Sequence, residues 1–401
     1  MQNIRKLTDD LYYIGCSDRR LQLFESAYPV PNGVSYNSYL LKDDKTVLFD
    51  TVDKACAEHF FTNLECALEG RALDYLVVHH MEPDHAALIK CLLNKYRDLK
   101  IVCTAKAKEM IQQFFDIDIT EQAILVKEGD SLNTGKHDFI FTMAPMVHWP
   151  EVMLSYDKTT KSLFSADAFG AFGAINGNLF DDEVDLNETY WNESRRYYTN
   201  IVGKYGQQVQ MLLKKASNLD ISTIYPLHGL IIKKHITDLI DKYNKWSTYT
   251  PEENGVLIVY SSVHGNTENA MEILAGKLAD NGVKNIKMYD VSFTHSSIIL
   301  AEAFRYSHIV IATTTYNMGM FESMEHFLQL LTSHNLQNRK FAIIENGSWA
   351  PTCGNLVRTA ISSLKGTEII ADNLCIKSSL NNNTLKELEN MAYILANQIK
   401  C

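Results

Sequence analysis

The sequence predicts an α+β domain followed by an α/β domain with a doubly wound parallel sheet. The first 250 of the 401 residues contain many short strand signals with interspersed helices, whereas the remainder alternates regularly between strands and helices. Residues 248–255 separate the two patterns, and this polar stretch with Pro251 and Gly255 is typical of a linker. A chain of this length is also too long for one ordinary hydrophobic core. We therefore expect two domains, residues 1–250 and residues 251–401.

The first domain is expected to be an α+β sandwich. Short apolar runs bounded by turn residues predict strands at residues 11–14, 35–41, 45–50, 73–78, 100–104, 123–128, 137–143, 152–156, 162–166 and 221–225. Apolar residues at helical spacing predict helices at residues 55–69, 86–96, 106–115 and 192–216. We expect the strands at 152–156 and 162–166 to pair across the turn at residues 158–160.

The second domain is expected to contain five β-α units, which form a five-stranded doubly wound parallel sheet. Its predicted strands are residues 256–260, 286–291, 308–312, 341–345 and 369–376. Its predicted helices are residues 267–279, 298–304, 320–331, 356–364 and 385–399. Asn383 or Thr384 is the expected N-cap of the last helix.

Composition and charge exclude several classes of protein. The net charge of -10 and the absence of a Lys/Arg run argue against nucleic acid as a partner. No run of about 18 apolar residues exists, and the first residues lack a signal-peptide pattern, so we expect no membrane segment. Eight cysteines are scattered without a Cys-x-x-Cys pair, at positions 16, 56, 66, 91, 103, 353, 375 and 401. We interpret them as reduced, mostly buried thiols in a cytoplasmic protein.

A dense group of polar residues follows the predicted strand at residues 73–78. His80, Glu82, Asp84 and His85 lie within six residues of one another. Such a density of nitrogen and oxygen ligands is costly to bury without a metal or other partners. Because side chains alternate in extended chain, His80, Glu82 and Asp84 can face one side, and His79 faces the other. We therefore expect His79 to support the site rather than to bind metal.

Three further candidates, His148, Asp167 and His228, also follow strand signals. Taken singly, each is most simply an ordinary hydrogen-bonding group. Together the seven positions provide four imidazoles and three carboxylates, too many for one tetrahedral zinc. They fit two metals that share one carboxylate bridge, and ligation without thiolate suits iron, manganese or zinc.

Three loops of the second domain point to a flavin. Residues 261–267 join the first strand to a helix, and hydroxyls at a helix N-terminus bind phosphate. This loop lacks the lysine of a nucleoside-triphosphate site and the glycine pattern of a dinucleotide site. Two later strands end in loops that resemble the flavin-ring loops of flavodoxins. The expected FMN-binding residues are Ser261, Ser262, Val263, His264, Gly265, Asn266, Thr267, Thr314, Thr315, Tyr316, Asn317, Asn346, Gly347, Ser348 and Trp349.

The metal motif resembles that of a known family. His80-x-Glu82-x-Asp84-His85 is similar to the His-x-His-x-Asp-His signature of the metallo-β-lactamase fold, with Glu82 in place of the second His. With that replacement, the segments at residues 145–150, 165–167 and 226–229 resemble those of flavodiiron proteins. The resemblance covers essentially the whole chain. It implies an αββα metallo-β-lactamase-like sandwich followed by a flavodoxin-like domain.

The resemblance also implies cofactors and an activity. One iron would bind His80, Glu82 and His148, the other would bind Asp84, His85 and His228, and Asp167 would bridge them. With FMN and two irons per subunit, the implied activity is reduction of oxygen to water or of nitric oxide to nitrous oxide. Both substrates, oxygen and nitric oxide, stay open from the sequence.

The implied partners are a small electron donor and a second copy of the chain. Because no Cys-x-x-Cys pair is present for a fused rubredoxin, we expect an external rubredoxin, with a deazaflavin as the alternative. The family arrangement is a head-to-tail homodimer, or a dimer of dimers, in which the flavin of one subunit faces the irons of the other.

Three residues are candidates for tuning the reaction: Glu25, Tyr197 and Tyr198. Some family members carry a His where Glu25 aligns, although a solvated surface Glu is an equal alternative. Two rival functions remain open from the sequence: a dizinc hydrolase fused to a flavodoxin, and a pure flavin electron carrier. Glu82 and the flavin loops argue against the hydrolase.

Overall fold

The computed structural model describes residues 2–400, which form two compact units. The first unit runs to Tyr198 and includes Gln207–Tyr243, whereas the second comprises Thr199–Gly206 and the chain from Asn244 onward. The domain ranges 1–250 and 251–401 stay a prediction.

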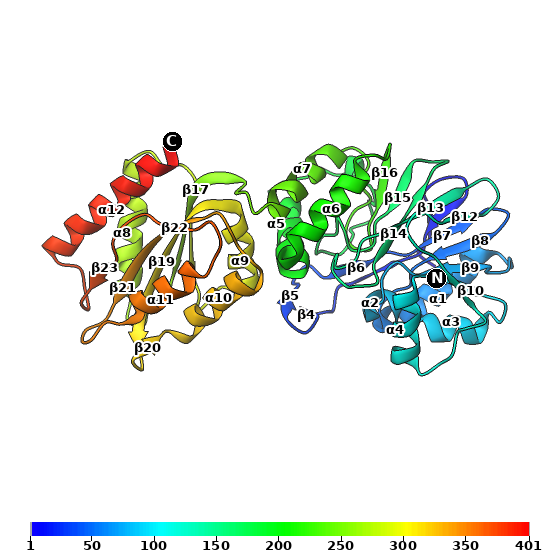
Figure 1. Cartoon of the computed structure of the whole chain (residues 1–401), viewed down its shortest axis with the longest axis horizontal. Helices are drawn as coiled ribbons and strands as arrows, with labels where there is room; N and C mark the ends of the chain where they lie inside the picture. Colours follow the sequence, from blue (N-terminus) through cyan, green and yellow to red (C-terminus); the bar gives the residue numbers. More distant parts are fainter. Residues whose placement is uncertain (1, 401) are drawn as a thin grey trace. The chain divides into compact units, whose positions relative to one another are not determined.

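Two sheets form the centre of the first unit (Figure 1). In spatial order, the seven-stranded sheet consists of β1 (Arg5–Lys6), β2 (Leu11–Tyr13), β7 (Tyr39–Lys42), β8 (Thr46–Phe49), β9 (Tyr75–Val77), β10 (Lys100–Cys103) and β11 (Ala123–Leu125). The five-stranded sheet consists of β12 (Ser131–Asn133), β13 (Asp138–Met143), β14 (Met153–Asp157), β15 (Ser162–Phe164) and β16 (Thr223–Tyr225). The predicted pairing of β14 with β15 is confirmed, since Ser155 lies opposite Phe164 in an antiparallel ladder.

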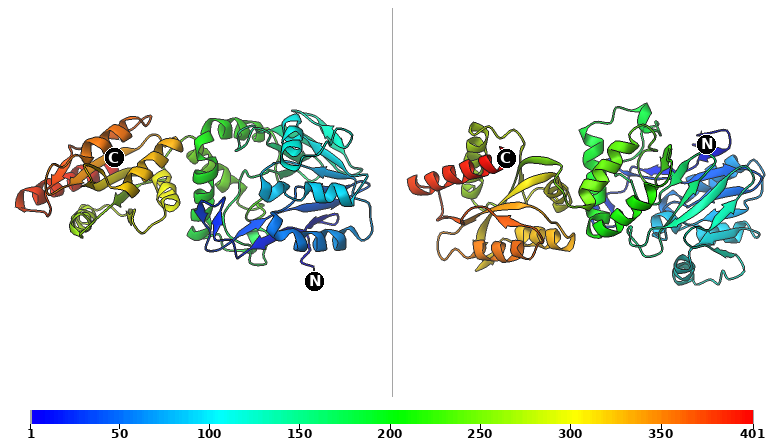
Figure 2. Two further views of the ribbon diagram at one scale, coloured as in Figure 1. Left: turned by 90° about the horizontal axis from the view of Figure 1, so that it is seen from below. Right: turned by 45° about the horizontal axis from the view of Figure 1, so that its top comes forward.

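Helices flank these sheets, with α1 to α4 along one side and α5 to α7 along the other (Figures 1 and 2). They are α1 (Ala57–Leu68), α2 (Pro83–Ala86), α3 (Ile89–Lys95), α4 (Ala105–Phe115), α5 (Glu188–Tyr197), α6 (Gly206–Ala216) and α7 (Ile236–Ser247). Along each strand, inward-facing side chains alternate with outward-facing ones. The inward-facing side chains of the two sheets pack together and form one apolar core. Phe49 of the first sheet stacks on Phe164 of the second, with ring centroids 4.1 Å apart.

Two small hairpin-like sheets lie beside this sandwich. Strand β3 (Cys16–Asp18) pairs with β6 (Val34–Tyr36), and β4 (Leu23–Phe24) pairs with β5 (Tyr28–Pro29). Strands β3, β4 and β5, like β1 and β12 of the larger sheets, were not predicted, because strands of two or three residues leave too short an apolar pattern.

Other predicted elements need correction. The expected strand at residues 35–41 is divided between β6 and β7, and the expected helix at 86–96 is divided between α2 and α3. The predicted helix at 192–216 is interrupted by a π-helical turn, Tyr198–Val202. Helix α7 was missed altogether. Local apolar spacing indicates where helices and strands can form, but it does not show where tertiary contacts interrupt them or stabilise a further helix.

The second unit is a mostly parallel sheet with helices on both faces, as predicted. Its strands, in spatial order, are β18 (Ile286–Asp290), β17 (Glu253–Tyr260), β19 (Tyr306–Tyr316), β21 (Lys340–Asn346) and a last position shared by β22 (Glu368–Ile369) and β23 (Leu374–Ile376). The short β20 (Gly319–Met320) pairs antiparallel with the end of β19. Its helices are α8 (Asn266–Asp280), α9 (Ser296–Arg305), α10 (Glu322–Ser333), α11 (Cys353–Ser362) and α12 (Asn382–Lys400).

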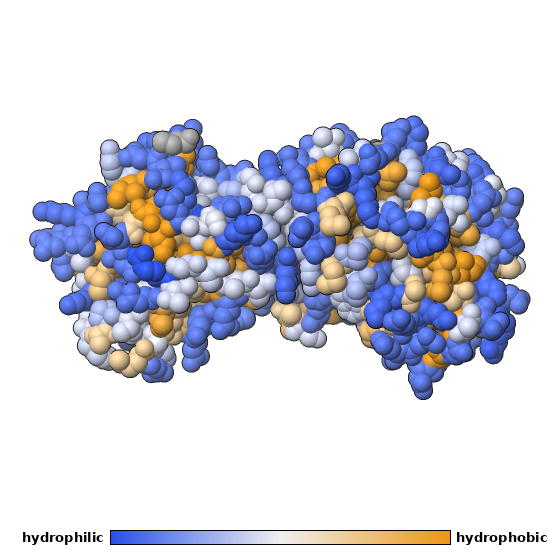
Figure 3. Space-filling view, in the orientation of Figure 1, coloured by the Kyte–Doolittle hydropathy of each residue, from blue (hydrophilic) through white to orange (hydrophobic). Residues whose placement is uncertain are grey.

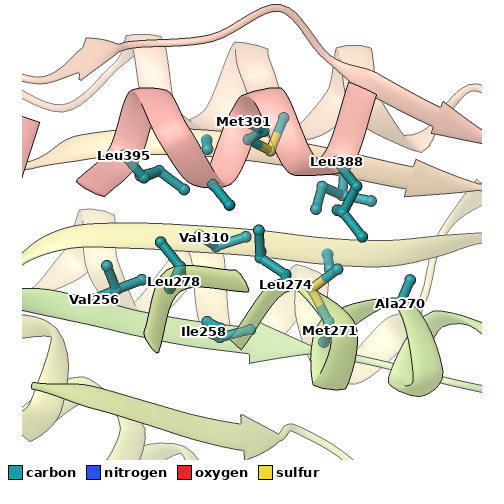
Figure 4. Close-up of a cluster of buried hydrophobic side chains, with 14 of the residues drawn as sticks. Val256, Ile258, Ala270, Met271, Leu274, Leu278, Val310, Leu388, Met391 and Leu395 are labelled. Carbon is teal, nitrogen blue, oxygen red and sulfur yellow. The ribbon is translucent and has the colours of Figure 1, made fainter. Parts of the chain in front are cut away.

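One face of this sheet is covered by α8 and α12. Figure 4 shows Leu274 of α8 and Leu388 of α12 among the buried side chains that pack against Ile258 and Val310 of the central strands. The N-cap of α12 is Asn381 rather than Asn383 or Thr384, since its side chain accepts hydrogen bonds from the N–H groups of those two residues.

The stretch expected to be a linker is partly ordered structure. Strand β17 already begins at Glu253, and Tyr249 is buried. The Arg339 guanidinium is also buried, and it donates hydrogen bonds to the carbonyl oxygens of Tyr249 and Phe304. A buried arginine that satisfies several carbonyl groups fixes this stretch to the second unit.

The surface in Figure 3 is mostly hydrophilic, with hydrophobic residues in scattered groups. Within residues 2–400 no helix is both long enough and apolar enough to cross a membrane.

The expectation that the cysteines are free thiols is wrong for two of them. Cys16 and Cys56 form a disulfide, with their Cα atoms 6.6 Å apart. Of the five free cysteines described, only Cys103 and Cys353 are buried, whereas Cys66 and Cys91 are exposed. The remaining cysteine, at position 401, lies outside the described residues. Sequence spacing did not indicate the pair because 40 residues separate its members.

His137 offers a test of how charge stabilises the first unit. Its Nδ1 lies 2.7 Å from Asp157 and its Nε2 lies 3.0 Å from Asp10. Burial opposes the charged imidazole, but the two carboxylates outweigh it and raise the His137 pKa, while the pKa values of Asp10 and Asp157 are lowered. The raised His pKa stabilises the fold below about pH 6.5, and the lowered Asp pKa values stabilise it above about pH 4.

We therefore predict that His137→Gln lowers the melting temperature by a few degrees between about pH 4.5 and 6.5. The difference from the wild type should shrink as the pH rises above 7. The exposed His59, changed to Gln, is the matched control. A difference that stays constant from pH 5 to 9 would contradict this account.

Candidate functional site

The ligand loop follows the carboxyl end of strand β9. His80 and Glu82 lie in extended chain, and helix α2 begins at Pro83, a residue well suited to a first helical position. Asp84 and His85 therefore lie in the first turn of the helix, with both side chains buried. This change from strand to helix brings all four polar side chains of the loop to one side.

The three distal candidates lie on loops after other strands. His148 follows β13, Asp167 follows β15 and His228 follows β16. Because β15 and β16 are parallel neighbours, their carboxyl ends bring Asp167 and His228 to the same edge of the sheet. The structure therefore gathers all seven predicted residues in one buried cluster, here called the metal cage.

The first half of the cage contains His80, Glu82 and His148. The Glu82 carboxylate lies 3.3 Å from His80 Nε2 and 3.1 Å from His148 Nε2. One oxygen of Asp167, Oδ2, lies 3.1 Å from His148 Nε2 and 3.4 Å from His80 Nε2. These atoms surround a point at which one metal ion would be bound.

The second half contains Asp84, His85 and His228. Asp84 Oδ2 lies 3.3 Å from the Nε2 atoms of both histidines. The other oxygen of Asp167, Oδ1, lies 3.1 Å from His85 Nε2 and 3.7 Å from His228 Nε2. Asp167 thus directs one oxygen to each half, which is the geometry of a bridging carboxylate.

Hydrogen bonds outside the cage orient two of its imidazoles. His228 Nδ1 donates to the carbonyl oxygen of Ser35 at 2.7 Å, and His80 Nδ1 donates to Glu151 Oε1 at 2.8 Å. A proton on Nδ1 leaves the lone pair of Nε2 directed into the cage. Glu151 also accepts the N–H of Met81 at 2.8 Å, which fixes the loop itself. Glu151 was not predicted as a supporting residue, although Glu151 directly follows the segment at residues 145–150 that contains His148.

The charges of the cage fit a bound cation. Burial disfavours charge on His80, His85 and His148, yet neighbouring carboxylates raise the pKa of His85 to about 8, of His148 to about 9, and of His80 well above its usual value. Despite burial, the imidazoles lower the pKa values of Asp167 and Glu82. Both oxygens of Asp84 and one of Asp167 are buried without a hydrogen-bond partner among residues 2–400. Unpartnered buried carboxylates are costly, so the donor set fits metal ions.

His79 lies outside the cage, as its position in the strand predicted. Its Nδ1 lies 2.6 Å from Asp50 and its Nε2 lies 2.8 Å from Ser155 Oγ. Its ring is parallel to that of Phe49, with centroids 6.0 Å apart. Since both ring nitrogens have partners, His79 anchors the loop and is not available to bind metal.

Tyr197 borders the second half of the cage. Its ring lies 5.3 Å from that of His228, and the absence of a side chain at Gly170 leaves room for it, since a Cβ there would lie 2.9 Å from the tyrosine ring. Burial, with the charges of the cage, raises the Tyr197 pKa well above its usual value, so the hydroxyl is protonated. Tyr198 packs instead against Tyr243. Tyr197 is therefore the tyrosine whose ring contacts a cage residue, His228.

Glu25 lies at the tip of the β4–β5 hairpin. Both Glu25 and Ser26 have positive φ values, 49° and 55°, which turn the hairpin. Desolvation, together with the neighbouring Glu82 carboxylate, raises the pKa of Glu25 to about 8. Glu25 is exposed, and a carboxyl whose pKa is raised in this way can hold a proton next to Glu82 at neutral pH.

A separate pocket of about 410 Å³ lies at the carboxyl ends of β17, β19 and β21 in the second unit. Such crevices bind ligands in sheets of this topology. Thirteen of the fifteen predicted FMN residues line it, together with two that were missed, Met318 and Ser378. The two predicted residues outside the lining are Ser261, which is buried against Thr313, and Gly265, which is the N-cap of α8 and has a φ of 84°.

The pocket has a polar end and an aromatic rim. Asn346 donates to Thr267 Oγ1 at 3.2 Å, and Thr267 lies 3.4 Å from Thr314, so these groups are gathered at the N-terminus of α8. Hydroxyls at a helix N-terminus suit a phosphate. Trp349 is 78% exposed and Tyr316 is 44% exposed, so neither is a core aromatic. The lining therefore fits a phosphate attached to a flat ring.

Fold and site together define a protein that joins a two-metal cage on a metallo-β-lactamase-like sandwich to a flavodoxin-like domain. Residues 34–229 match the family described as ODP family beta lactamase, and residues 258–384 match flavodoxin.

Known proteins share this arrangement. The anaerobic nitric oxide reductase flavorubredoxin of Vibrio vulnificus is 30% identical over 346 residues, covering 85% of this chain and 69% of that protein. The structure of rubredoxin oxygen:oxidoreductase from the anaerobe Desulfovibrio gigas matches with a TM-score of 0.93 at 26% identity, covering 99% of each chain. The flavodiiron protein of Giardia intestinalis shares the fold, with a TM-score of 0.93 at 21% identity over 100% of this chain and 97% of that one. The chain belongs to the flavodiiron protein family, and the predicted fold class is confirmed.

Glu151→Gln tests the hydrogen bond behind the cage. The amide oxygen can still accept the N–H of Met81, but it cannot stabilise the His80 ring as a carboxylate does. We expect apparent metal affinity to fall about 10- to 100-fold, as is typical when such a supporting residue is lost. Titration with a chelator measures the effect, with the exposed Glu109→Gln as control. An unchanged affinity would show that Glu151 does not tune His80.

Asp167→Ala tests the bridge. Both halves of the cage lose a carboxylate oxygen, so we expect iron to be lost while FMN is retained, because the two sites lie in separate units. Thr267→Ala is the reciprocal variant and should weaken FMN binding with two irons still present. Iron and FMN counts on both purified variants give the result, and loss of both cofactors from either one would refute independent sites.

Proposed function

We propose that this protein is an oxidoreductase that uses FMN and a pair of non-haem iron ions to reduce oxygen to water or nitric oxide to nitrous oxide. The observation that supports this most strongly is the position of Asp167, with one carboxylate oxygen directed to each pair of imidazoles. The same chain supplies a pocket with the chemistry of a flavin site.

Each half of the cage provides three ligands of its own in this proposal. One iron would be held by His80, Glu82 and His148, the other by Asp84, His85 and His228, and Asp167 would offer one oxygen to each. When bound, the flavin and the two irons supply four electrons in total, which is the number that reduction of one oxygen molecule to water requires. Reduction of two nitric oxide molecules to nitrous oxide requires two.

Glu82 distinguishes this proposal from hydrolysis at zinc. A carboxylate in place of a neutral imidazole adds negative charge to the site, which favours the higher oxidation state of iron. Glu82 lies within 3.3 Å of two imidazoles, so its charge acts directly on the ligands around one metal position.

Two side chains are proposed to manage protons. The Tyr197 hydroxyl, which keeps its proton because its pKa is raised, belongs to a buried residue whose ring contacts His228, so it could donate a hydrogen bond to a substrate molecule in the cage. Glu25 holds a proton against Glu82 and can deliver it at the mouth of the cage. Proton delivery matters because both proposed reductions consume protons.

The electron donor and the assembly are also proposals. Two of the similar proteins are a flavorubredoxin and a rubredoxin oxygen:oxidoreductase, and this supports a small donor of the rubredoxin type. A head-to-tail homodimer, in which each flavin faces the partner's irons, is supported by the exposed rim of the flavin pocket, where Trp349 and Met318 are 78% and 68% exposed. A cytoplasmic location stays a prediction.

The decisive experiment is anaerobic reduction of the purified protein, followed by separate additions of oxygen and nitric oxide. We expect two irons and one FMN per chain, water without released peroxide from oxygen, and nitrous oxide from nitric oxide. Two zinc ions with hydrolytic turnover would overturn the proposal in favour of a hydrolase. Reoxidation at the rate of free flavin, with hydrogen peroxide as product, would favour a pure electron carrier.

Variants of the two proton-handling residues sharpen this test. Tyr197→Phe removes one hydroxyl and should slow turnover without loss of iron, because the ring still packs against His228. Glu25→Gln keeps the shape of the side chain but cannot release a proton. Oxygen and nitric oxide rates equal to those of the wild type would remove the corresponding residue from the proposal.

A further inference from the structure

A polar cavity of about 620 Å³ lies in the first unit, and none of the seven cage residues lines it. Three arginines and one aspartate, Arg5, Arg19, Arg20 and Asp18, are among the lining residues, together with His59. The guanidinium groups therefore outnumber the carboxylate, and the cavity has a local positive charge in a protein whose net charge is -10. Such a cavity attracts small anions.

Local hydrogen bonds hold two of the arginines in place. Arg19 Nη2 donates to the carbonyl oxygen of Ile175 and to the side chain of Asn176, both at 2.8 Å, and Arg5 Nη1 donates to the carbonyl oxygen of Gly177 at 2.6 Å. Carbonyl oxygens do not neutralise a guanidinium, so the contacts of Arg19 fix the position of its charge without removing it. Arg5 also lies 3.9 Å from Glu183 Oε1, which offsets part of its charge, whereas Arg19 and Arg20 keep theirs.

The Cys16–Cys56 disulfide forms part of the wall of this cavity. Cys16 lies on β3, Cys56 ends the 3-10 turn Lys54–Cys56, and both residues line the cavity. A disulfide reacts only where a thiolate can approach one of its sulfurs. Here the approach to the bond is a cavity lined by cationic side chains.

We propose that Cys16–Cys56 is a reversible thiol–disulfide exchange site, and that its reaction partner is a small anionic thiol that enters this cavity. The thiolate attacks one cysteine sulfur, forms a mixed disulfide and releases the other cysteine as a thiolate, which takes a proton. A second small thiol then attacks the mixed disulfide, and the products are a protein dithiol and one small disulfide. The reverse reaction consumes one small disulfide and restores the cross-link.

The cross-link joins two segments that support the second half of the metal cage. Cys16 lies opposite Tyr36 in the β3–β6 pair, and the Tyr36 ring contacts the ring of His228 with centroids 5.8 Å apart. On the other side, the Cys56 turn closely follows Thr51, whose N–H and hydroxyl both donate to the carbonyl oxygen of His85. Reduction therefore removes the covalent link between the segment that supports His228 and the segment that supports His85.

Other contacts keep this region folded when the bond is reduced. The side chain of Asn63 on α1 donates to the carbonyl oxygens of Ile14 and Gly15 and accepts the N–H of Asn3. The reduced protein is thus a looser form of the same fold. The inference does not depend on the proposed oxidoreductase activity, so either can fail without the other.

The first experiment compares three thiols of similar size: anionic 3-mercaptopropionate, neutral mercaptoethanol and cationic cysteamine. Exposed Cys66 and Cys91 are first blocked by alkylation. Newly formed thiols at Cys16 and Cys56 are then labelled with a second reagent and counted by peptide mass spectrometry over time. Each thiol is compared with itself between protein variants, so differences in intrinsic reactivity cancel.

Arg20→Gln is the informative variant, because Arg20 is exposed and the hydrogen bonds recorded for it within residues 2–400 involve its backbone N–H and carbonyl rather than its guanidinium. At low ionic strength we expect reduction by 3-mercaptopropionate to slow about two- to threefold, with mercaptoethanol unaffected. Arg97→Gln, exposed and outside the cavity, should change neither rate. Equal slowing with all three thiols, or none with the anionic thiol, overturns the assignment of the cavity. Absence of the Cys16–Cys56 cross-link, even after mild oxidation, overturns the site itself.

Hydrogen exchange of the protein as purified tests the link to the cage. On reduction, peptides that contain residues 34–36 and 51–56 should exchange several-fold faster, whereas peptides from the second unit should not change. The double variant Cys16→Ser with Cys56→Ser should reproduce the faster exchange, and Cys66→Ser is its control. Identical exchange in the oxidised and reduced proteins would contradict the proposed coupling.

Discussion

The buried carboxylate of Asp167 is the group on which the rest of the metal cage depends. It directs one oxygen to His80 and His148 and the other to His85 and His228, so a single side chain makes one cage of two halves. Burial of so many polar groups is unfavourable unless protons or metal ions balance their charges. The raised imidazole pKa values show how strongly the carboxylates attract positive charge to this place. Metal binding would replace those protons, which links metal affinity to pH.

Support for the cage comes from parts of the chain that are distant in sequence. Glu151 orients His80 from 71 positions away, and the Ser35 carbonyl orients His228 from 193 positions away. The Ser35 strand is paired with β3, and β3 bears one half of the disulfide. The β3–β6 pair therefore contributes to metal geometry through β6 and, in our proposal, to thiol chemistry through β3. Reactivity of the cage and redox state of the cysteines would be coupled through backbone contacts rather than through the metals.

Much of the fold could be predicted because local patterns agree with the global arrangement. Regular alternation after Val256 indicates the parallel sheet, and strand ends identify both loops that complete the flavin pocket. Predictions failed where tertiary contacts outweigh local pattern: β17 extends into the expected linker, and helix α7 was missed. Glu151 was missed because a buried carboxylate that supports a ligand has no spacing rule. The disulfide was missed because scattered cysteines gave no sign that Cys16 and Cys56 meet.

The sequence by itself determined the residue types of the site: four imidazoles and three carboxylates after strand-like runs, and hydroxyl-rich loops before a helix. These follow from local periodicity, since strand ends and helix starts are encoded by neighbouring residues. Only the tertiary structure decided which atoms face one another, because that depends on strand order and on hydrogen bonds between distant segments. It separated Tyr197 from Tyr198, placed the exposed Glu25 next to Glu82, and joined Cys16 to Cys56. Distances of a few ångströms between residues over a hundred positions apart are set by packing of the whole unit.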